Sequence, residues 1–203
     1  MLNADQHATI TEAIKRAEAT TSGEIRVVVT TRPLIRHPFY AVMWAALLAL
    51  ALPWPLALLT TFSIPELLAI QAVTFILIGA ALMFTPLGSR VVPRAALDAA
   101  ARAAAIDHFL VQGIHQTRAR TGVLIMVALH EHIVEVVADE GIHAQVGHDA
   151  WQAVCETVLV GARDDRLTDG LVEGVAHAGR ILAAHVPRQP DDTNELPDRV
   201  VII

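Results

Sequence analysis

The sequence predicts an α/β fold, in which a small mixed sheet is sandwiched by helices and a two-helix transmembrane hairpin is inserted after the first strand. Three short runs, 24–31, 122–129 and 133–138, are rich in β-branched residues, and other segments repeat apolar residues at helical spacing. In the long run from Phe39 to Phe84, Glu66 is the only formally charged residue. Such a run is too long and too apolar for a soluble core, so it predicts two membrane passes joined by a turn.

A helix and a strand are expected before the hairpin. Apolar residues recur at helical spacing in 4–20, which predicts an amphipathic helix. The recurring residues are Ile10, Ala13, Ile14 and Ala17. The run 24–31 is nearly continuous in Val, as in a strand that is covered on both faces.

The chain after the hairpin continues with a long helix, two strands and two helices. Pro93 can occupy the first turn of a helix that runs to about 118, with an inward stripe at helical spacing. The stripe consists of Ala103, Ile106, Leu110, Ile114 and Thr117. The runs 122–129 and 133–138 predict an antiparallel pair, and 148–162 and 168–185 predict the closing helices. Because the first strand reaches the second through a helix, these two strands are expected to be parallel.

The predicted domain organisation follows from the position of the hairpin. Residues 1–38 and 87–187 are expected to build one discontinuous domain, interrupted by the hairpin at 39–86. The Pro- and Asp-rich stretch 188–203 is expected to be an irregular tail. Its closing Val-Val-Ile-Ile has two alternative roles, as an edge strand of the sheet or as a peptide ligand.

Charges that flank the hairpin predict its orientation. Arg32 and Arg36 precede the first pass, Arg90 and Arg94 follow the second, and the turn 60–66 holds no Lys or Arg. Positive residues favour the cytoplasmic side. The expected location is therefore the inner (plasma) membrane, with both termini and the folded domain in the cytoplasm. A Pro-Trp-Pro sequence is expected to break or kink the first pass, and a re-entrant first segment is the alternative.

Composition narrows the classes of function. The formal net charge is −6 without long runs of one sign, which argues against a nucleic-acid-binding surface. Cys155 is the only cysteine, so no disulfide can form within the chain. The sequence contains neither Gly-x-Ser-x-Gly nor a phosphate-binding loop. No complete catalytic motif is present, and the question of enzymatic activity stays open.

Carboxylates at one edge of the expected sheet form a candidate metal site. With two parallel strands followed by an antiparallel one, the start of the first strand and the end of the third lie at the same edge. This topology places Glu24 near Asp139 and Glu140. Three carboxylates could bind calcium or another divalent cation, with carbonyl and water ligands completing the shell. The alternative is strand-end chemistry, in which they cap a helix, stabilise a turn or contact an arginine.

Residues near the opposite edge and before the second strand are weaker candidates. His130 and His132 lie two apart in the turn between the second and third strands, and His37 precedes the membrane run. Two turn histidines can share a metal, but the HExxH spacing is absent, so a solvated turn is favoured. Arg118 and Arg120 are expected to bind an anion or lipid head group or, as favoured, to form a solvated helix end.

Four segments of the chain resemble the TPM domain family. They are 22–29, 121–142, the helix around Trp151, and 170–187. The resemblance implies an α/β sandwich, calcium binding, assembly or repair of membrane complexes and, in one branch, acid phosphatase activity. The chain departs from the family in three places: only Asp5 can stand for the Asp-containing lead-in, Asp139 replaces a glycine-rich turn, and the hairpin replaces a short loop. The family's metal ligands are therefore not carried over.

The sequence supports three functional expectations, all of which include the lipid bilayer as a partner. The first is a membrane-anchored binding or assembly module, dependent on a divalent cation such as calcium and acting on a membrane-protein partner. The second is a membrane-bound, metal-dependent phosphatase-like hydrolase. The third is a structural homo-oligomer packed through its hairpins, in which small residues permit close helix contact. These residues are Ala46, Ala49, Ala51, Gly79, Ala80 and Ala81.

Overall fold

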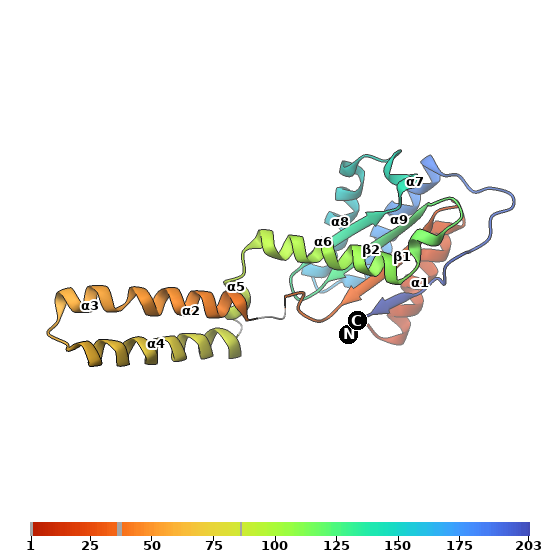
Figure 1. The fold of residues 1–203 in the computed structure, drawn as a ribbon. Coiled ribbons are helices and arrows are strands. Elements are labelled where there is room, and N and C mark those ends of the chain that lie inside the picture. Colours follow the sequence, from red (N-terminus) through yellow and green to blue (C-terminus); the bar gives the residue numbers. More distant parts are fainter. Residues whose placement is uncertain (1, 36–37, 86) are drawn as a thin grey trace. The chain divides into compact units, whose positions relative to one another are not determined.

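The computed structural model describes residues 2–35, 38–85 and 87–203. Within these residues a four-stranded sheet has the strand order β3-β2-β1-β4 (Figure 1). β1 is parallel to β2 and β4, and β2 is antiparallel to β3. The strands are β1 (Glu24–Thr30), β2 (Gly122–Ala128), β3 (Ile133–Ala138) and β4 (Val200–Ile202). The predicted α/β class and the predicted pairing of the first three strands are confirmed.

Helices cover both faces of this sheet. They are α1 (Ala4–Glu18), α6 (Arg94–Val111), α8 (His148–Arg163) and α9 (Leu167–His185), with two short helices, η1 (Ile114–Gln116) and α7 (Glu140–His143). Ile25 and Val27 of β1 belong to a core cluster built with α1, α8 and α9, whereas Val28 belongs to a second cluster with Phe109 of α6. Alternate residues of a strand point to opposite faces. Every residue of β1 and β2 is consequently buried, as the continuous apolar runs predicted.

The predicted inward stripe is wrong within α6, whereas its last two members, Ile114 and Thr117, are buried as predicted. Ile106 and Leu110 were expected to face inward, but 43% and 52% of their surfaces are exposed. The buried residues of α6 are Ala101, Ala105 and Phe109. Phe109 is 7% exposed and belongs to the core cluster that includes Val28 of the sheet. The helix also ends at Val111, well before 118, and Gly113 follows with a left-handed φ of 70°.

The C-terminal tail contains a strand. Val200–Ile202 forms β4, which pairs in parallel with Val27–Val29 of β1. The Ile203 N–H also donates to the Val29 carbonyl at 3.0 Å, and the Thr31 N–H donates to the Ile203 carbonyl at 2.9 Å. The edge-strand alternative for the closing Val-Val-Ile-Ile is therefore confirmed.

The apolar run is helical, with an interruption at the predicted Pro-Trp-Pro sequence. Its helices are α2 (Phe39–Ala51), α3 (Pro53–Leu59) and α4 (Ile64–Phe84), followed by α5 (Leu87–Arg90). Two stretches, Phe39–Leu59 and Ile64–Phe84, are long and apolar enough to cross a membrane, by length and composition. Small buried residues of α2, including Ala45, face α4, and a Cβ on Gly79 would lie 3.8 Å from the Ala45 Cβ.

The chain divides into two compact units. One consists of Met1–Leu34 and Asp98–Ile203 and holds the sheet; we call it the α/β unit. The other, Ile35–Leu97, holds the helices of the apolar run. Both core clusters described above are made of α/β-unit residues.

Candidate functional site

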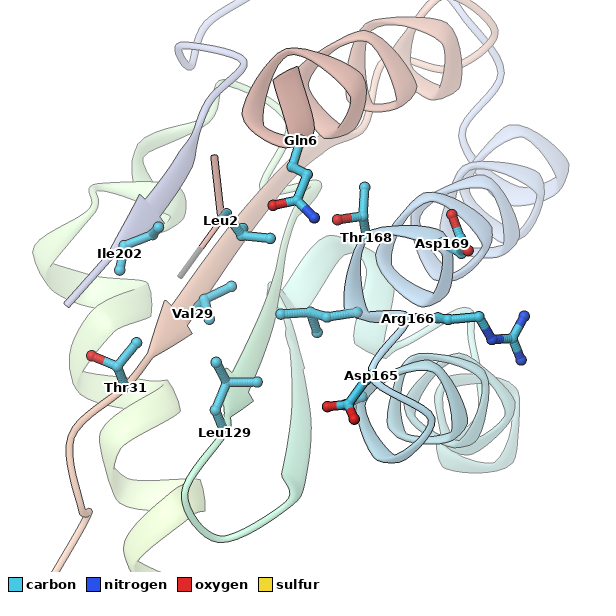
Figure 2. A pocket seen from close by; sticks show the side chains of 12 residues that line it. Leu2, Gln6, Val29, Thr31, Leu129, Asp165, Arg166, Thr168, Asp169 and Ile202 are labelled. Carbon is cyan, nitrogen blue, oxygen red and sulfur yellow. The ribbon is translucent and has the colours of Figure 1, made fainter. Parts of the chain in front are cut away.

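Two hollows of the α/β unit lie at opposite ends of β1. One, with a volume of about 380 Å³, is bordered by Val29 and Thr31 at the carboxyl end of the strand (Figure 2). The other, of about 140 Å³, is bordered by Glu24 at the amino end. Only the second of these two hollows includes a residue of the sequence-predicted metal site.

The amino edge of the sheet has the predicted topology. Glu24 is in register with Gly122, and the Asp139 N–H donates to the Gly122 carbonyl at 2.9 Å. The start of β1 and the end of β3 therefore share one edge. Because β2 lies between them, their backbones are two strand spacings apart, about 9.5 Å.

Asp139 has structural partners at this edge. Only 4% of its surface is exposed. Its Oδ1 accepts a hydrogen bond from the Glu140 N–H at 2.7 Å, which caps α7, and it pairs with Arg120 Nε at 3.1 Å. Glu140 is exposed in the first turn of α7. The cap and arginine contacts that the sequence left as the alternative are thus present at Asp139.

Glu24 is directed to the C-terminal tail. It is 6% exposed, its Oε1 accepts the Glu195 N–H at 3.0 Å, and its Oε2 has no hydrogen-bond partner within the described residues. Burial raises the pKa of Glu24, although hydrogen bonds from the backbone of Glu195 and Leu196 oppose the rise. A buried carboxylate oxygen without a partner is costly unless a proton or cation occupies it.

Glu18, at the end of α1, is a half-buried carboxylate near Glu24. Its Oε1 accepts the Ile25 N–H at 2.8 Å. Burial raises the pKa of Glu18 to about 9, and the charges of Glu24 and Asp198 and a hydrogen bond with Asp198 add to the rise. Glu18 therefore holds a proton at neutral pH.

Arg26 provides the positive charge of this cluster. It is 2% exposed, two residues after Glu24 on the same side of β1, and its guanidinium donates to the Pro197 carbonyl. Burial lowers the pKa of Arg26, and so does the nearby charge of Arg199, whereas three carboxylates raise it. We call Glu18, Glu24, Arg26 and Asp198 the buried charge cluster, in which Glu24 and Arg26 are buried and Glu18 and Asp198 are half-buried.

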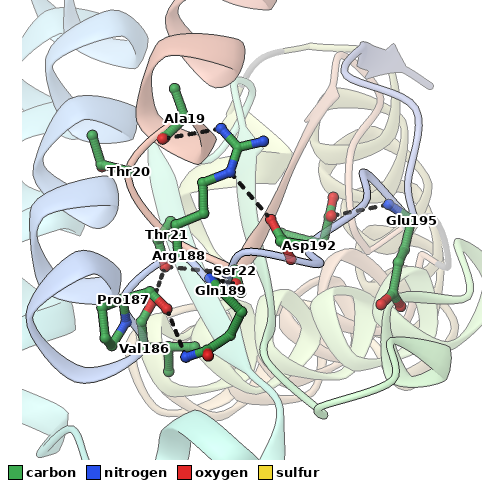
Figure 3. Close-up of polar contacts among 12 residues, drawn as sticks. Ala19, Thr20, Thr21, Ser22, Val186, Pro187, Arg188, Gln189, Asp192 and Glu195 are labelled. Carbon is green, nitrogen blue, oxygen red and sulfur yellow. Dashed lines mark hydrogen bonds and ion pairs between the residues drawn. The ribbon is translucent and has the colours of Figure 1, made fainter.

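The tail is fixed over this cluster by polar contacts at its root (Figure 3). The Arg188 guanidinium donates to the Ala19 carbonyl at 3.1 Å and pairs with Asp192 at 3.7 Å. The Gln189 N–H donates to Ser22 Oγ at 2.9 Å. Further along, Glu195 accepts the Arg118 N–H at 2.7 Å. The segment 188–199 therefore forms one wall of the small hollow.

Sequence reasoning placed Glu24 but missed its partners. Glu18 and Asp198 are far apart in the chain and meet only because the tail crosses the end of α1. Arg26 carried a signal, since a charged residue in a strand that is covered on both faces needs a buried partner. That signal identifies the need for a carboxylate, but not which carboxylate supplies it.

The histidine turn has its own internal contacts. His130 Nδ1 lies 3.5 Å from Glu131 Oε1, which also accepts the Leu34 N–H at 2.9 Å, and His132 has a positive φ of 53°. His37 lies outside the described residues. Over residues 2–35, 38–85 and 87–203, no group of three or more His, Cys, Asp or Glu side chains is arranged to hold a metal ion. The divalent-cation site stays a prediction.

Comparison with known proteins supports the fold. No protein-family model matches the chain, and no curated protein does. The chain is similar to the BA42 protein of the psychrophilic bacterium Bizionia argentinensis, whose structure was determined by NMR. The two share 22% identity with a TM-score of 0.64, over 100% of this chain and 96% of the other. At this identity the likeness shows a common fold.

Proposed function

We propose that the chain is a membrane-anchored, TPM-like binding or assembly module that acts on a membrane-protein partner and uses a divalent cation. The TPM resemblance of the segments around β1, β2, β3 and α9 supports the module. The fold shared with the BA42 protein is a likeness of fold alone.

The proposal of a membrane anchor rests on the exposed apolar surface of the unit Ile35–Leu97. Trp54, Leu58, Leu59 and Ile64 are between 75% and 85% exposed, and no charged residue other than Glu66 interrupts the run. Soluble proteins rarely expose apolar side chains in so continuous a patch. A lipid bilayer would cover them, and each stretch has the length that a bilayer core requires.

Cysteine labelling tests the proposed orientation. The one native thiol is a weak competitor, because burial raises the pKa of Cys155 to about 11. In a Cys155→Ala background, Thr61→Cys places a thiol in the exposed turn between the passes, and Asp191→Cys places one in the exposed tail. We expect a membrane-impermeant maleimide to label the turn in intact bacterial spheroplasts and the tail only after the membrane is opened. Labelling of the tail in intact cells would reverse the orientation, and equal labelling of both would contradict two passes.

Calcium titration of the detergent-solubilised chain tests the cation. The protein donor would be Glu24, through the Oε2 that has no hydrogen-bond partner within the described residues, with carbonyl and water ligands completing the shell. We expect calcium to raise the melting temperature of the wild type. At a hundredfold excess over Kd, binding adds about 2.7 kcal/mol to the free energy of unfolding. Glu24→Gln, which keeps an acceptor for the Glu195 N–H, should abolish the shift. The matched control Glu140→Gln, at an exposed carboxylate, should retain it.

Crosslinking in native membranes tests the partner with the same variants. A discrete heteromeric product is expected with calcium for the wild type and Glu140→Gln, and its loss is expected with a chelator or with Glu24→Gln. If calcium raised the melting temperature of Glu24→Gln as much as that of the wild type, the cation would be removed from the proposal. If the only crosslinked product were a homo-oligomer, the partner would be a second copy of this chain. Phosphomonoester turnover that disappears in Glu24→Gln would favour the hydrolase.

A further inference from the structure

The larger hollow has the position and size of a small-molecule site. It lies where the carboxyl ends of β1 and β2 meet the start of α9, and its volume is about 380 Å³ (Figure 2). β1 is flanked by two parallel strands. In α/β sheets, ligands bind outside the carboxyl ends of such strands, in pockets of roughly 300–1,000 Å³.

One part of the hollow is apolar. Side chains from α1's lead-in, three strand ends and α9 meet there, and they are Leu2, Val29, Leu129, Leu167 and Ile202. These residues come from segments that are far apart in the sequence. An aliphatic group of a ligand would be removed from water against them.

Hydrogen-bond donors lie at the start of α9. The Thr168 hydroxyl is buried without a hydrogen-bond partner within the described residues, and Thr168 is one of the residues that line the hollow. The N-cap residue Arg166 gives no side-chain hydrogen bond to the first turn. The first N–H groups of a helix and its dipole favour a negatively charged ligand group. This end of the hollow is therefore suited to a carboxylate.

Carboxylates also border the hollow, so negative side chains lie beside the positive N-terminal end of α9. Asp165 and Asp169 contribute to the lining. The Arg166 guanidinium does not neutralise them there, because it pairs with Asp164 at 3.0 Å and points away from the hollow in Figure 2. Asp165 extends from the loop towards Leu129. A ligand that carried only a negative charge would be repelled by these side chains.

We propose that this hollow binds a zwitterionic small molecule with an apolar side chain, a free aliphatic α-amino acid. The ligand carboxylate accepts from Thr168 and the first turn of α9, and its ammonium group pairs with Asp165. Its side chain packs between Val29 and Leu129. This site lies at the opposite end of β1 from the buried charge cluster, so it does not depend on the cation or partner proposed above.

Calorimetric titration of the full chain in detergent tests the proposal, with three probes that share one side chain. L-leucine carries both charged groups, 4-methylpentanoate lacks the ammonium, and 3-methylbutylamine lacks the carboxylate. We expect binding of L-leucine and, for either analogue, binding weaker by about tenfold or more, the effect of losing one charged hydrogen bond.

Variants assign the two charged contacts. Asp165→Asn, which tolerates the positive φ of 56° at this position, should weaken L-leucine binding by about tenfold or more. The matched control is Glu173→Gln, at an exposed carboxylate of α9 outside the hollow, and it should bind as the wild type does. Thr168→Val should weaken binding without lowering the melting temperature of the unliganded chain, because its hydroxyl has no protein partner to lose.

Two results would overturn the zwitterion site. One is that all three probes bind with equal affinity, or that none of them binds. The other is unchanged L-leucine affinity in Asp165→Asn, which would leave the ammonium without its proposed contact. The Glu173→Gln control shows whether a loss of affinity in Asp165→Asn is specific to that carboxylate.

Discussion

Arg26 is followed in its strand by three Val residues, and its charge has to be stabilised from outside that strand. The Pro197 carbonyl accepts from its guanidinium, and the charges of Glu24 and Asp198 favour its charged form. Removing one partner of a buried charge costs far more than the net gain from the pair. The buried charge cluster therefore makes the tail part of the fold, because Pro197 and Asp198 belong to the tail.

The titration of Glu18 predicts a pH dependence of stability. Its pKa is about 9 in the folded chain against 4.5 for the unperturbed group, so the folded chain holds a proton that the unfolded chain releases in this interval. The contribution of Glu18 to the free energy of unfolding is full below about pH 4.5 and is lost as the pH rises towards about 9. Glu18→Gln stays neutral and keeps an oxygen for the Ile25 N–H. Its melting temperature should therefore decrease less than that of the wild type between about pH 5 and pH 8.5.

The matched control for this experiment is Glu12→Gln, an exposed carboxylate on the same helix. It should follow the wild-type melting curve at both pH values. If Glu18→Gln were less stable than the wild type at the higher pH, Glu18 would act there as an ion, and the protonated cluster described above would be wrong.

At the scale of elements, sequence patterns predicted the strands better than the helix faces. β1 and β2 were predictable because a run of Val and Ile that is covered on both faces has no competing arrangement. The pairing followed from chain connection, since a helical crossover gives parallel strands. These two facts alone place Glu24 and Asp139 at one edge of the sheet.

The face of α6 was not predictable from spacing, because the helix is rich in Ala and offers two stripes. One stripe contains Ile106 and Leu110, and the other contains Ala105 and Phe109. Turning from one to the other requires a rotation of about one residue, 100°. The choice is made by how Phe109 fits against Val28 and Met126 of the sheet, which sequence periodicity does not encode.

The partners of Glu24 in the C-terminal tail were likewise not predictable from sequence patterns. Its Pro and Asp content is typical of an irregular segment, and only three residues of it pair as a strand. The carboxylates that meet Glu24 depend on how that segment crosses α1 and β1. Contacts between positions so distant in the sequence have no local signal, so Glu18 and Asp198 could not be joined to Glu24 in advance.

At the scale of the whole molecule, the apolar run interrupts one domain without contributing to its core. Both hydrophobic core clusters consist of residues before Leu34 or after Asp98, with Leu34 at the border of the second. The strands that the run separates, β1 and β2, pair along the full length of β1. The folding information of the α/β unit thus lies on both sides of the insertion.

This separation predicts that the α/β unit folds without the hairpin. Replacing residues 39–92 by a flexible Gly-Ser linker of about twelve residues, which spans about 20 Å on average, leaves both core clusters and the buried charge cluster complete. We expect a water-soluble chain with a cooperative thermal transition and with the Glu18-dependent decrease of melting temperature at high pH. Circular dichroism at the two pH values, on this chain and on its Glu18→Gln variant, measures both. A non-cooperative transition would show that the hairpin stabilises the sheet. A cooperative one without the Glu18 effect would show that the tail packs over Glu18 only when the hairpin is present.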